Sequence, residues 1–162
     1  MKSTVAIYDS HRTAIDAIEV LKNKSYPVNL VSVLGQAKIV DEDIQLESNQ
    51  LSNNLSVSFG VVLDSTLAAL SGARILCIKG LGFVFCAGKI TTSITGFYIG
   101  FSGLGIAAIL SSAGIKNNRA DACCKYLNEG KYLVIAQGNK KEIERAINIL
   151  SDCGKYIKLS IN

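Results

Sequence analysis

The chain contains no tryptophan, one proline and one histidine among its 162 residues. Charged residues make up 19% of it, which is below the roughly 25% of an average soluble domain. With a single histidine, neither a Ser–His–Asp nor a Cys–His arrangement can be read from the sequence, and no paired carboxylates stand out. We therefore expect a protein without enzyme activity, with no catalytic residue and no bound cofactor.

Cysteine pairs of the kind that bind zinc or exchange disulfides are also missing. The cysteines are odd in number and form no C-x-x-C pair, and His11 is far from every one of them in the sequence. We expect reduced, mostly buried thiols and no structural metal. The adjacent Cys123 and Cys124 are interpreted as small apolar fillers rather than a redox pair. The cysteines are Cys77, Cys86, Cys123, Cys124 and Cys153.

The sequence also lacks a concentration of positive charge and the pattern of an N-terminal signal peptide. The net charge is +4, but no arginine-rich run or basic stripe with interleaved aromatic residues occurs. We therefore expect no nucleic-acid partner. The first residues, MKSTVAIYDSHR, lack the continuous apolar region of a signal peptide. The expected location is the cytoplasm, with membrane association as the alternative.

The most distinctive segment that is present, Ile90–Ile115, carries no charge at all. It exceeds the about 20 residues that a helix needs to span a bilayer, although it is rich in glycine, serine and threonine. On a helical wheel its small residues share one side, where another backbone can approach closely. Each glycine destabilises a helix by about 1 kcal/mol relative to alanine, so such a helix needs a packing partner. We predict self-association through this glycine zipper, formed by Gly96, Gly100, Gly103 and Ala107.

The first 35 residues have the pattern of a strand, a helix and a second strand. Thr4–Tyr8 is a short apolar run, and Asp9-Ser10 after it is suited to cap a helix. Apolar residues recur at helical spacing over Thr13–Lys24. Val28–Leu34 is then predicted to be a strand closed by Gly35.

The last residues repeat this order. Tyr132–Ala136 and Tyr156–Ile161 are predicted strands, and Lys141–Leu150 between them is a predicted amphipathic helix. Its apolar face consists of Ile143, Ala146, Ile147 and Leu150.

Two βαβ units of this size pack readily into one sheet with both helices on one face. We therefore predict an α+β fold in which residues 1–35 and 131–162 form a ferredoxin-like domain. Residues 36–130 are predicted to be a mainly helical, glycine-rich insert that splits this domain.

The insert is predicted to contain further elements besides the uncharged helix. Asp41–Asn54 is acidic and favours either a helix start or a linker. Phe59–Ala73 is nearly apolar and predicts a hydrophobic helix that forms a hairpin with Ile90–Ile115. Phe83–Phe85, bounded by glycines, predicts an extended piece. Asn117-Asn118 is suited to cap a last amphipathic helix.

The order of these elements resembles the general stress protein 17M-like family, which overlaps with bacterial low-temperature-induced proteins. The resemblance covers nearly the whole chain but departs from the family's prolines at Lys79, Phe83, Lys89 and Lys116. It implies an association with stress, and it implies no established chemistry and no catalytic residues. The segments that carry it are Val5–Ser10, Ile78–Phe83, Ala87–Ile90, Gly114–Tyr126 and Glu129–Val134.

Asp64 is the only charged residue in the predicted hydrophobic helix. A buried carboxylate is costly unless it is paired. We therefore expect Asp64 to form a buried ion pair with Arg74, Lys79 or Lys89, to lie on the rim of a helical bundle, or to transfer protons.

Ser10, His11 and Arg12 occupy the first strand-to-helix turn. A helix N-terminus attracts anions, so this turn is a candidate anion site. No glycine-rich phosphate loop accompanies it, and a solvated histidine beside the cap is the simpler interpretation.

Three hypotheses about function follow from the sequence. The first is a non-enzymatic, stress-associated protein that assembles with itself through the insert. The second is a membrane-associated protein whose insert lies in the bilayer as a helical hairpin. The third is a regulatory module that binds a small ligand.

Overall fold

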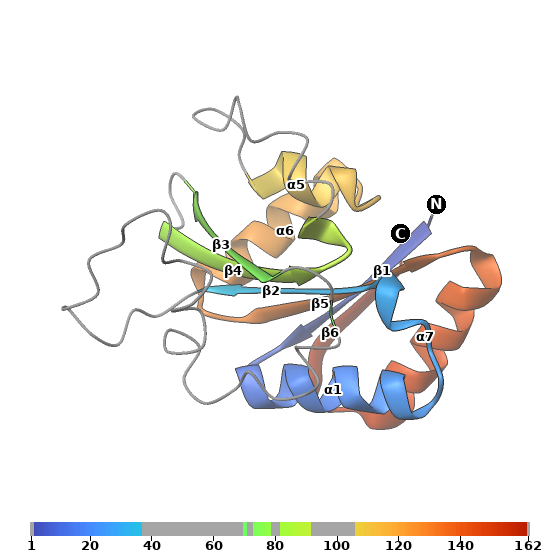
Figure 1. The fold of residues 1–162 in the computed structure, drawn as a ribbon. Coiled ribbons are helices and arrows are strands. Elements are labelled where there is room, and N and C mark those ends of the chain that lie inside the picture. The colour runs from blue at the N-terminus through green and yellow to red at the C-terminus, as the bar shows by residue number, and fades with distance from the viewer. Residues whose placement is uncertain (1, 37–69, 71–72, 79–81, 92–105, 162) are drawn as a thin grey trace.

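Antiparallel strands form the centre of the molecule, and helices cover both faces of the sheet (Figure 1). The structure is a computed structural model that describes residues 2–36, 70, 73–78, 82–91 and 106–161. The α+β class predicted from the sequence is confirmed. The strands are β1 (Lys2–Tyr8), β2 (Val31–Gln36), β3 (Ala73–Ile78), β4 (Gly82–Gly88), β5 (Tyr132–Gly138) and β6 (Tyr156–Ile161).

The six strands form one sheet in the order β3-β4-β2-β5-β1-β6. Every neighbouring pair is antiparallel, and β1 lies between β5 and β6. Helices α1 and α7 pack together on one face, whereas α5 and α6 pack together on the other (Figure 1). The helices are α1 (His11–Asn23), α5 (Ile106–Ser112), α6 (Asn117–Asn128) and α7 (Lys140–Cys153), with a 3-10 turn, η1 (Val28–Leu30), before β2.

Both faces of the central strands are buried. In β1, Ala6 and Tyr8 belong to the core under α1 and α7, whereas Val5 and Ile7 belong to the core under α5 and α6. Successive side chains of a strand point to opposite faces, so a strand covered on both sides needs an unbroken apolar run. This requirement explains why β1 and β5 have nearly continuous apolar sequences.

Helices α1 and α7 begin at capping boxes. The Ser10 hydroxyl accepts a hydrogen bond from the Thr13 N–H at 3.3 Å, and Asn139 Oδ1 accepts one from the Glu142 N–H at 3.0 Å. The cap predicted at Ser10 is therefore confirmed. The predicted apolar face of α7 is wrong at one position, because Ile149 rather than Ile147 is buried.

The second predicted strand starts and ends later than the sequence indicates. Val28–Leu30 forms η1 after Pro27, so β2 begins at Val31. Gly35 lies inside β2 instead of closing it. A Cβ atom at Gly35 would lie 2.3 Å from Cδ1 of Tyr132, so this glycine makes room for the Tyr132 ring on the neighbouring strand.

The insert contributes two strands to the sheet. The extended piece predicted at Phe83–Phe85 is confirmed as part of β4. The helix predicted for Phe59–Ala73 lies mostly outside the described residues, but its predicted end is wrong. Leu70 lies in a bend, and Ala73 begins β3, which the sequence reading missed and which pairs with β4. Asp41–Asn54 lies outside the described residues.

The helix predicted for Ile90–Ile115 ends before its predicted last residue. Helix α5 ends at Ser112, because Gly114 adopts a positive φ of 82° and the Ile115 N–H bonds back to the Leu110 carbonyl at 3.1 Å. The next helix also differs at its start. Lys116 is the N-cap of α6, and Asn117 is already helical.

Two buried polar side chains attach the α5–α6 connection to the sheet. The Ser3 hydroxyl donates to the Gly114 carbonyl at 3.1 Å, and Gln137 Nε2 donates to the Ala113 carbonyl at 2.8 Å. Both side chains are fully or almost fully buried, so these bonds satisfy donors that water does not reach. They fix α6 above β2 and β5, its main strand contacts.

Candidate functional site

One face of α6 points toward the β1–β6 side of the sheet. Arg119, Ala122, Cys123 and Tyr126 occupy positions i, i+3, i+4 and i+7, which places them along one side of a helix. Ala120 and Leu127 lie on the adjoining side, where they are fully buried against the sheet. Arg119, Ala122, Cys123 and Tyr126 therefore lie at the edge of the core, on the side of α6 that faces β1 and β6.

The strands supply the opposite wall. Val5 is the register partner of Ser160, and Ile7 is the register partner of Lys158. Side chains two apart on a strand share a face, so these four residues lie together on the α6 side of β1 and β6. The main strand contacts of α6 are with β2 and β5, and one side of the helix faces these β1 and β6 residues.

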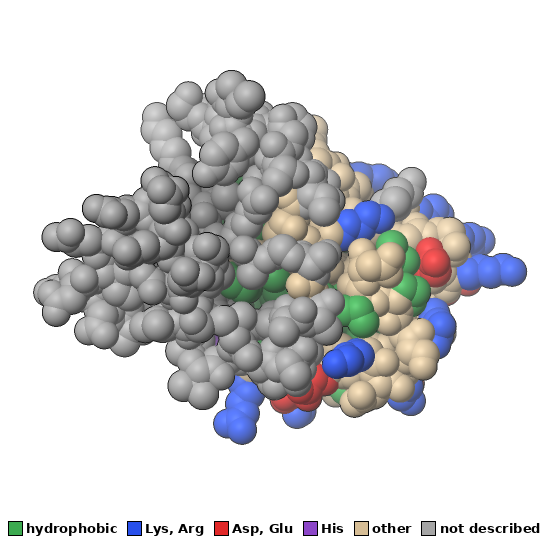
Figure 2. Space-filling view, viewed as in Figure 1, with side chains coloured by type: hydrophobic (Ala, Val, Ile, Leu, Met, Phe, Trp, Pro, Cys, Tyr) green, Lys and Arg blue, Asp and Glu red, His purple; other side chains and the backbone are tan. Residues whose placement is uncertain are grey.

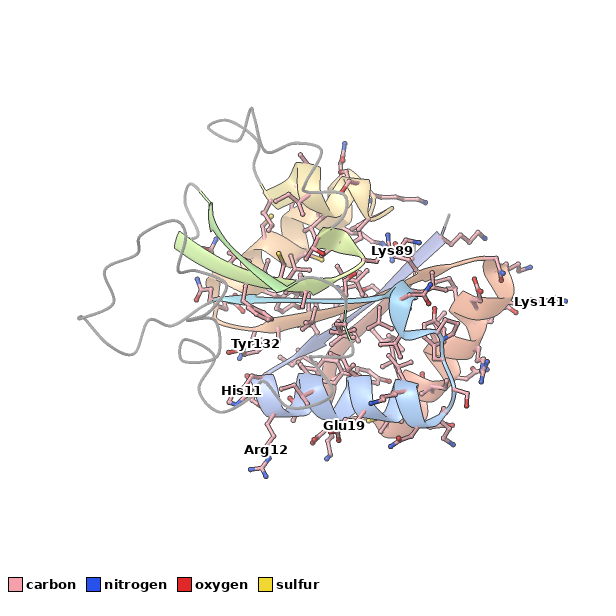
Figure 3. All side chains as sticks on the ribbon, in the orientation of Figure 1. His11, Arg12, Glu19, Lys89, Tyr132 and Lys141 are labelled. Carbon is pink, nitrogen blue, oxygen red and sulfur yellow. The ribbon has the colours of Figure 1, made fainter. Side chains whose placement is uncertain are left out.

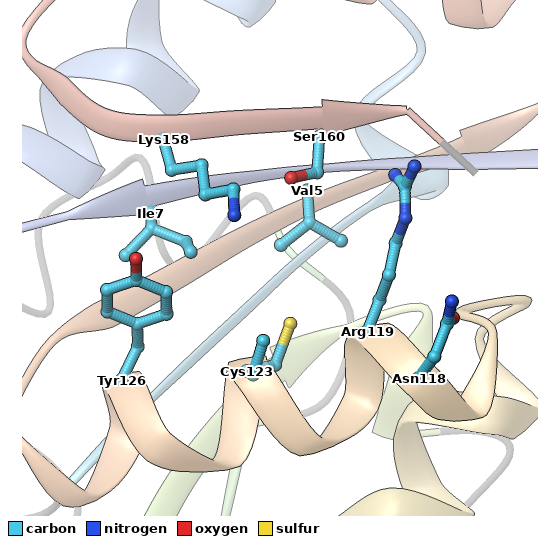
Figure 4. Close-up of a pocket in the computed structure, with 9 residues that line it drawn as sticks. Val5, Ile7, Asn118, Arg119, Cys123, Tyr126, Lys158 and Ser160 are labelled. Carbon is cyan, nitrogen blue, oxygen red and sulfur yellow. The ribbon is translucent and has the colours of Figure 1, made fainter.

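The space between these walls is a pocket of about 210 Å³ (Figure 4). Lys158 reaches down from β6, Arg119 and Tyr126 reach up from α6, and the Cys123 thiol points into the space between them. Val5 and Ile7 are 2% and 3% exposed and line the pocket on the β1 side. The lining residues are Val5, Ile7, Asn118, Arg119, Ala122, Cys123, Tyr126, Lys158 and Ser160.

Opposing effects act on the Cys123 thiol in this pocket. Burial raises the pKa of Cys123 to about 11, and the neighbouring Cys124 raises it as well, whereas Lys158 and Arg119 lower it. The thiol is therefore protonated at neutral pH and is a poor nucleophile.

Alkylation of Cys123 by iodoacetamide should follow this raised pKa. Thiolate is the reactive form, so we expect the rate to rise through about pH 11, whereas an unperturbed cysteine is half ionised near about pH 8.5. Because the folded pKa lies above the unfolded one, the thiol's contribution to stability is present below about pH 9 and is lost as the pH rises toward 11. Pulse labelling and peptide mass spectrometry on a Cys124→Ser variant would measure the profile. Labelling of Cys123 at pH 8 at the rate of the denatured chain would contradict it.

The three residues predicted to form an anion site at the start of α1 have separate surroundings in the structure. The Ser10 hydroxyl is engaged in the helix cap, and the His11 ring stacks edge-on against Tyr132 with the ring centroids 6.2 Å apart. Arg12 points away from the sheet (Figure 3). The neighbouring Asp9 forms an ion pair with Lys131. The structure thus places Ser10, His11 and Arg12 in one turn but does not aim them at a common point.

The other predicted site residues lie largely outside the described part of the chain. Asp64 and the side chain of Arg74 are among them, so their ion pair stays a prediction. Gly96, Gly100 and Gly103 also lie outside the described residues. Ala107 is half-buried on α5 and packs against the core beneath it.

No helix of the described segments is both long and apolar enough to cross a membrane. Over the same segments, no three His, Cys, Asp or Glu side chains are grouped so that they could hold a metal ion. Four of the cysteines are free thiols, namely Cys86, Cys123, Cys124 and Cys153.

The pocket was missed from the sequence, although parts of its pattern were visible. Arg119, Cys123 and Tyr126 share a helix face, and Lys158 and Ser160 alternate on a strand. Each pattern alone is typical of a solvated surface. Only the position of α6 beside β6 brings the two together, and that position depends on long-range packing.

Outside the pocket, the described charges are dispersed. On the face in Figure 2, lysine and arginine side chains stand around the rim of the molecule with aspartate and glutamate among them. Comparisons with protein-family models, curated proteins and solved structures find no match for the chain. The resemblance to the general stress protein 17M-like family therefore stays a prediction.

Proposed function

We propose that the protein is a module that binds a small anion in the pocket between α6 and the β1–β6 edge. The observation that carries this proposal is the pair Arg119 and Lys158, which line one small pocket from two different elements. Hydroxyl groups of Tyr126 and Ser160 line the same pocket and can donate hydrogen bonds. This is the third hypothesis from the sequence, at a different site.

Physical chemistry favours an anion at this point over a cation or a neutral ligand. Both side chains carry positive charge and donate hydrogen bonds, so an anion between them gains favourable electrostatic contacts. A hydrogen bond to a charged group contributes about 1.5–3 kcal/mol, which corresponds to roughly 10- to 100-fold in affinity. The pocket is partly walled by apolar side chains, which weaken competition from water. With Cys123 protonated, we assign no reaction to the pocket.

Titration with inorganic phosphate and with acetate, followed by backbone amide NMR, tests this proposal. We expect shifts at Cys123, Tyr126 and Ser160, and about tenfold weaker binding in Arg119→Gln and in Lys158→Gln because each loses one charged hydrogen bond. Lys125→Gln on α6 and Lys155→Gln before β6 are matched controls, since both lie outside the pocket lining.

Two results of these titrations would contradict the proposal. It is wrong if neither phosphate nor acetate shifts the amide signals of the pocket residues. It is equally wrong if the control variants weaken binding as much as the pocket variants do, because the effect would then come from net charge alone.

We further propose that residues 1–35 and 131–162 have the ferredoxin-like arrangement expected from the sequence. The strand order β2-β5-β1-β6 supports it, as does the packing of α1 and α7 together on one face. In this arrangement β3 and β4 extend the sheet beyond β2, and α5 and α6 cover its second face. The stress association and the self-assembly through Gly96, Gly100, Gly103 and Ala107 stay separate hypotheses.

A further inference from the structure

The charged side chains that line the pocket are all of one sign. Arg119 and Lys158 are cationic, and none of the lining residues is an aspartate or a glutamate. No carboxylate of the lining therefore competes with a bound anion for hydrogen-bond donors. At equal distance from a cation, an anion with two negative charges gains twice the Coulomb energy of an anion with one.

Hydrogen-bond donors stand on two opposite walls of the pocket. The ammonium group of Lys158 and the hydroxyl group of Ser160 come from β6, whereas the hydroxyl group of Tyr126 comes from α6 (Figure 4). Within the described residues, none of these three side-chain groups forms a hydrogen bond or an ion pair. All three can therefore donate to a ligand.

The placement of these donors distinguishes between anions of different shape. The two oxygens of a carboxylate lie at one end of the group, so a carboxylate that contacts Lys158 turns its substituent toward the opposite wall. A phosphate group has three strong acceptor oxygens, and sulfate has four, directed to different sides of the central atom. Such a group can accept hydrogen bonds from Lys158 and Ser160 on one wall and from Tyr126 on the other.

We infer that the preferred ligand is a tetrahedral dianion, either sulfate or the phosphate group of a small monoester. Lys158 and Ser160 hold it from β6, and Tyr126 holds it from α6. This inference rests on the proposed function and names the ligand class of the same pocket.

Four ligands of different shape and charge test the inference in amide NMR titrations at pH 8 and constant ionic strength. Acetate is a planar monoanion and methyl sulfate a tetrahedral monoanion. Sulfate and methyl phosphate are tetrahedral dianions, because the second pKa of a phosphate monoester is about 6. Methyl phosphate should bind at least about fivefold more tightly than methyl sulfate, which has the same shape and one charge fewer. Tighter binding of sulfate than of methyl phosphate would identify the free ion as the ligand, and the reverse order would identify a phosphate monoester.

Two variants separate the effect of shape from the effect of charge. Tyr126→Phe removes the donor on α6 and keeps the ring, so methyl phosphate should bind about tenfold more weakly and acetate less than about threefold more weakly. Lys158→Gln removes a charge, so it should reduce the preference for methyl phosphate over methyl sulfate by at least about threefold. Tyr156→Phe is the matched control, because Tyr156 packs against the core under α1 and α7 and lies outside the pocket lining.

The outcomes distinguish this inference from the proposed function on which it rests. If methyl phosphate and methyl sulfate bind equally well and both depend on Lys158, the inference is wrong and the anion site stands. Equal losses of acetate and methyl phosphate binding in Tyr126→Phe would also overturn the inference, because the hydroxyl group would then not select the tetrahedral shape. If none of the four ligands shifts the amide signals of Cys123, Tyr126 or Ser160, both the inference and the proposed function are wrong.

Discussion

Replacing Gly88 with alanine is expected to lower the free energy of unfolding by about 4 kcal/mol. Gly88 has a φ of 94°, which an L-residue rarely adopts. An alanine Cβ there would lie 2.1 Å from the Val31 carbonyl oxygen and 2.8 Å from the Ser32 Cα. Both atoms belong to the backbone of β2, so a side-chain rotation cannot relieve the overlap and β4 must shift away from its partner strand. Urea unfolding followed by circular dichroism should show a midpoint lower by about 2 M.

Gly130→Ala is the matched control for this substitution. Gly130 also has a positive φ, of 79°, but among the described residues the atom nearest its added Cβ, apart from its chain neighbours, is Gln36 Oε1 at 4.0 Å. It should therefore lose only the backbone preference, about 1–2 kcal/mol. Equal losses at Gly88 and Gly130 would mean that the close approach of β4 to β2 does not contribute.

Replacing Phe85 with alanine is also expected to lower the free energy of unfolding by about 4 kcal/mol. Phe85 is fully buried in β4, within the core that α1 and α7 cover. Its register partner on β2 is Gly35, which has no side chain of its own to fill the space left by the ring. The cavity then adds to the lost transfer free energy.

This substitution also measures whether β4 and the flanking halves unfold as one unit. Native-state hydrogen exchange should show the loss of protection in β1 and β5 as well as in β4, because one continuous core connects them. Ile157→Ala is the control, since Ile157 is 46% exposed at the sheet edge and should change stability by less than about 0.5 kcal/mol. Unchanged protection in β1 and β5 of Phe85→Ala would show that β4 folds as a separate unit.

The two ends of the chain were largely predictable because their signals are local. Ser10 caps α1 by a hydrogen bond with Thr13, three positions later, so the start of this helix can be predicted from a few adjacent residues. The same holds for β5 and α7, where apolar periodicity and length separate the strand from the helix.

The elements that were missed depend on partners far away in the sequence. Ala73–Ile78 is a strand because β4 pairs with it, and its six residues alone do not distinguish a strand from the end of a helix. Gly35 was interpreted as a terminator, although the ring of Tyr132 explains its presence inside β2. The pocket required the placement of α6 beside β6, which neither segment encodes by itself.

The position of β1 has a consequence for synthesis of the chain. Both strands that pair with β1 come from the last residues, after Lys131, although β1 itself begins at Lys2. A ribosome therefore synthesises the entire stretch from β1 to β5 before β1 can pair, and the apolar side chains of β1 lack their partners during that time. Such long-range closure slows folding, and an unpaired apolar strand invites aggregation. The nascent protein is therefore most exposed to aggregation just before β5 and β6 emerge.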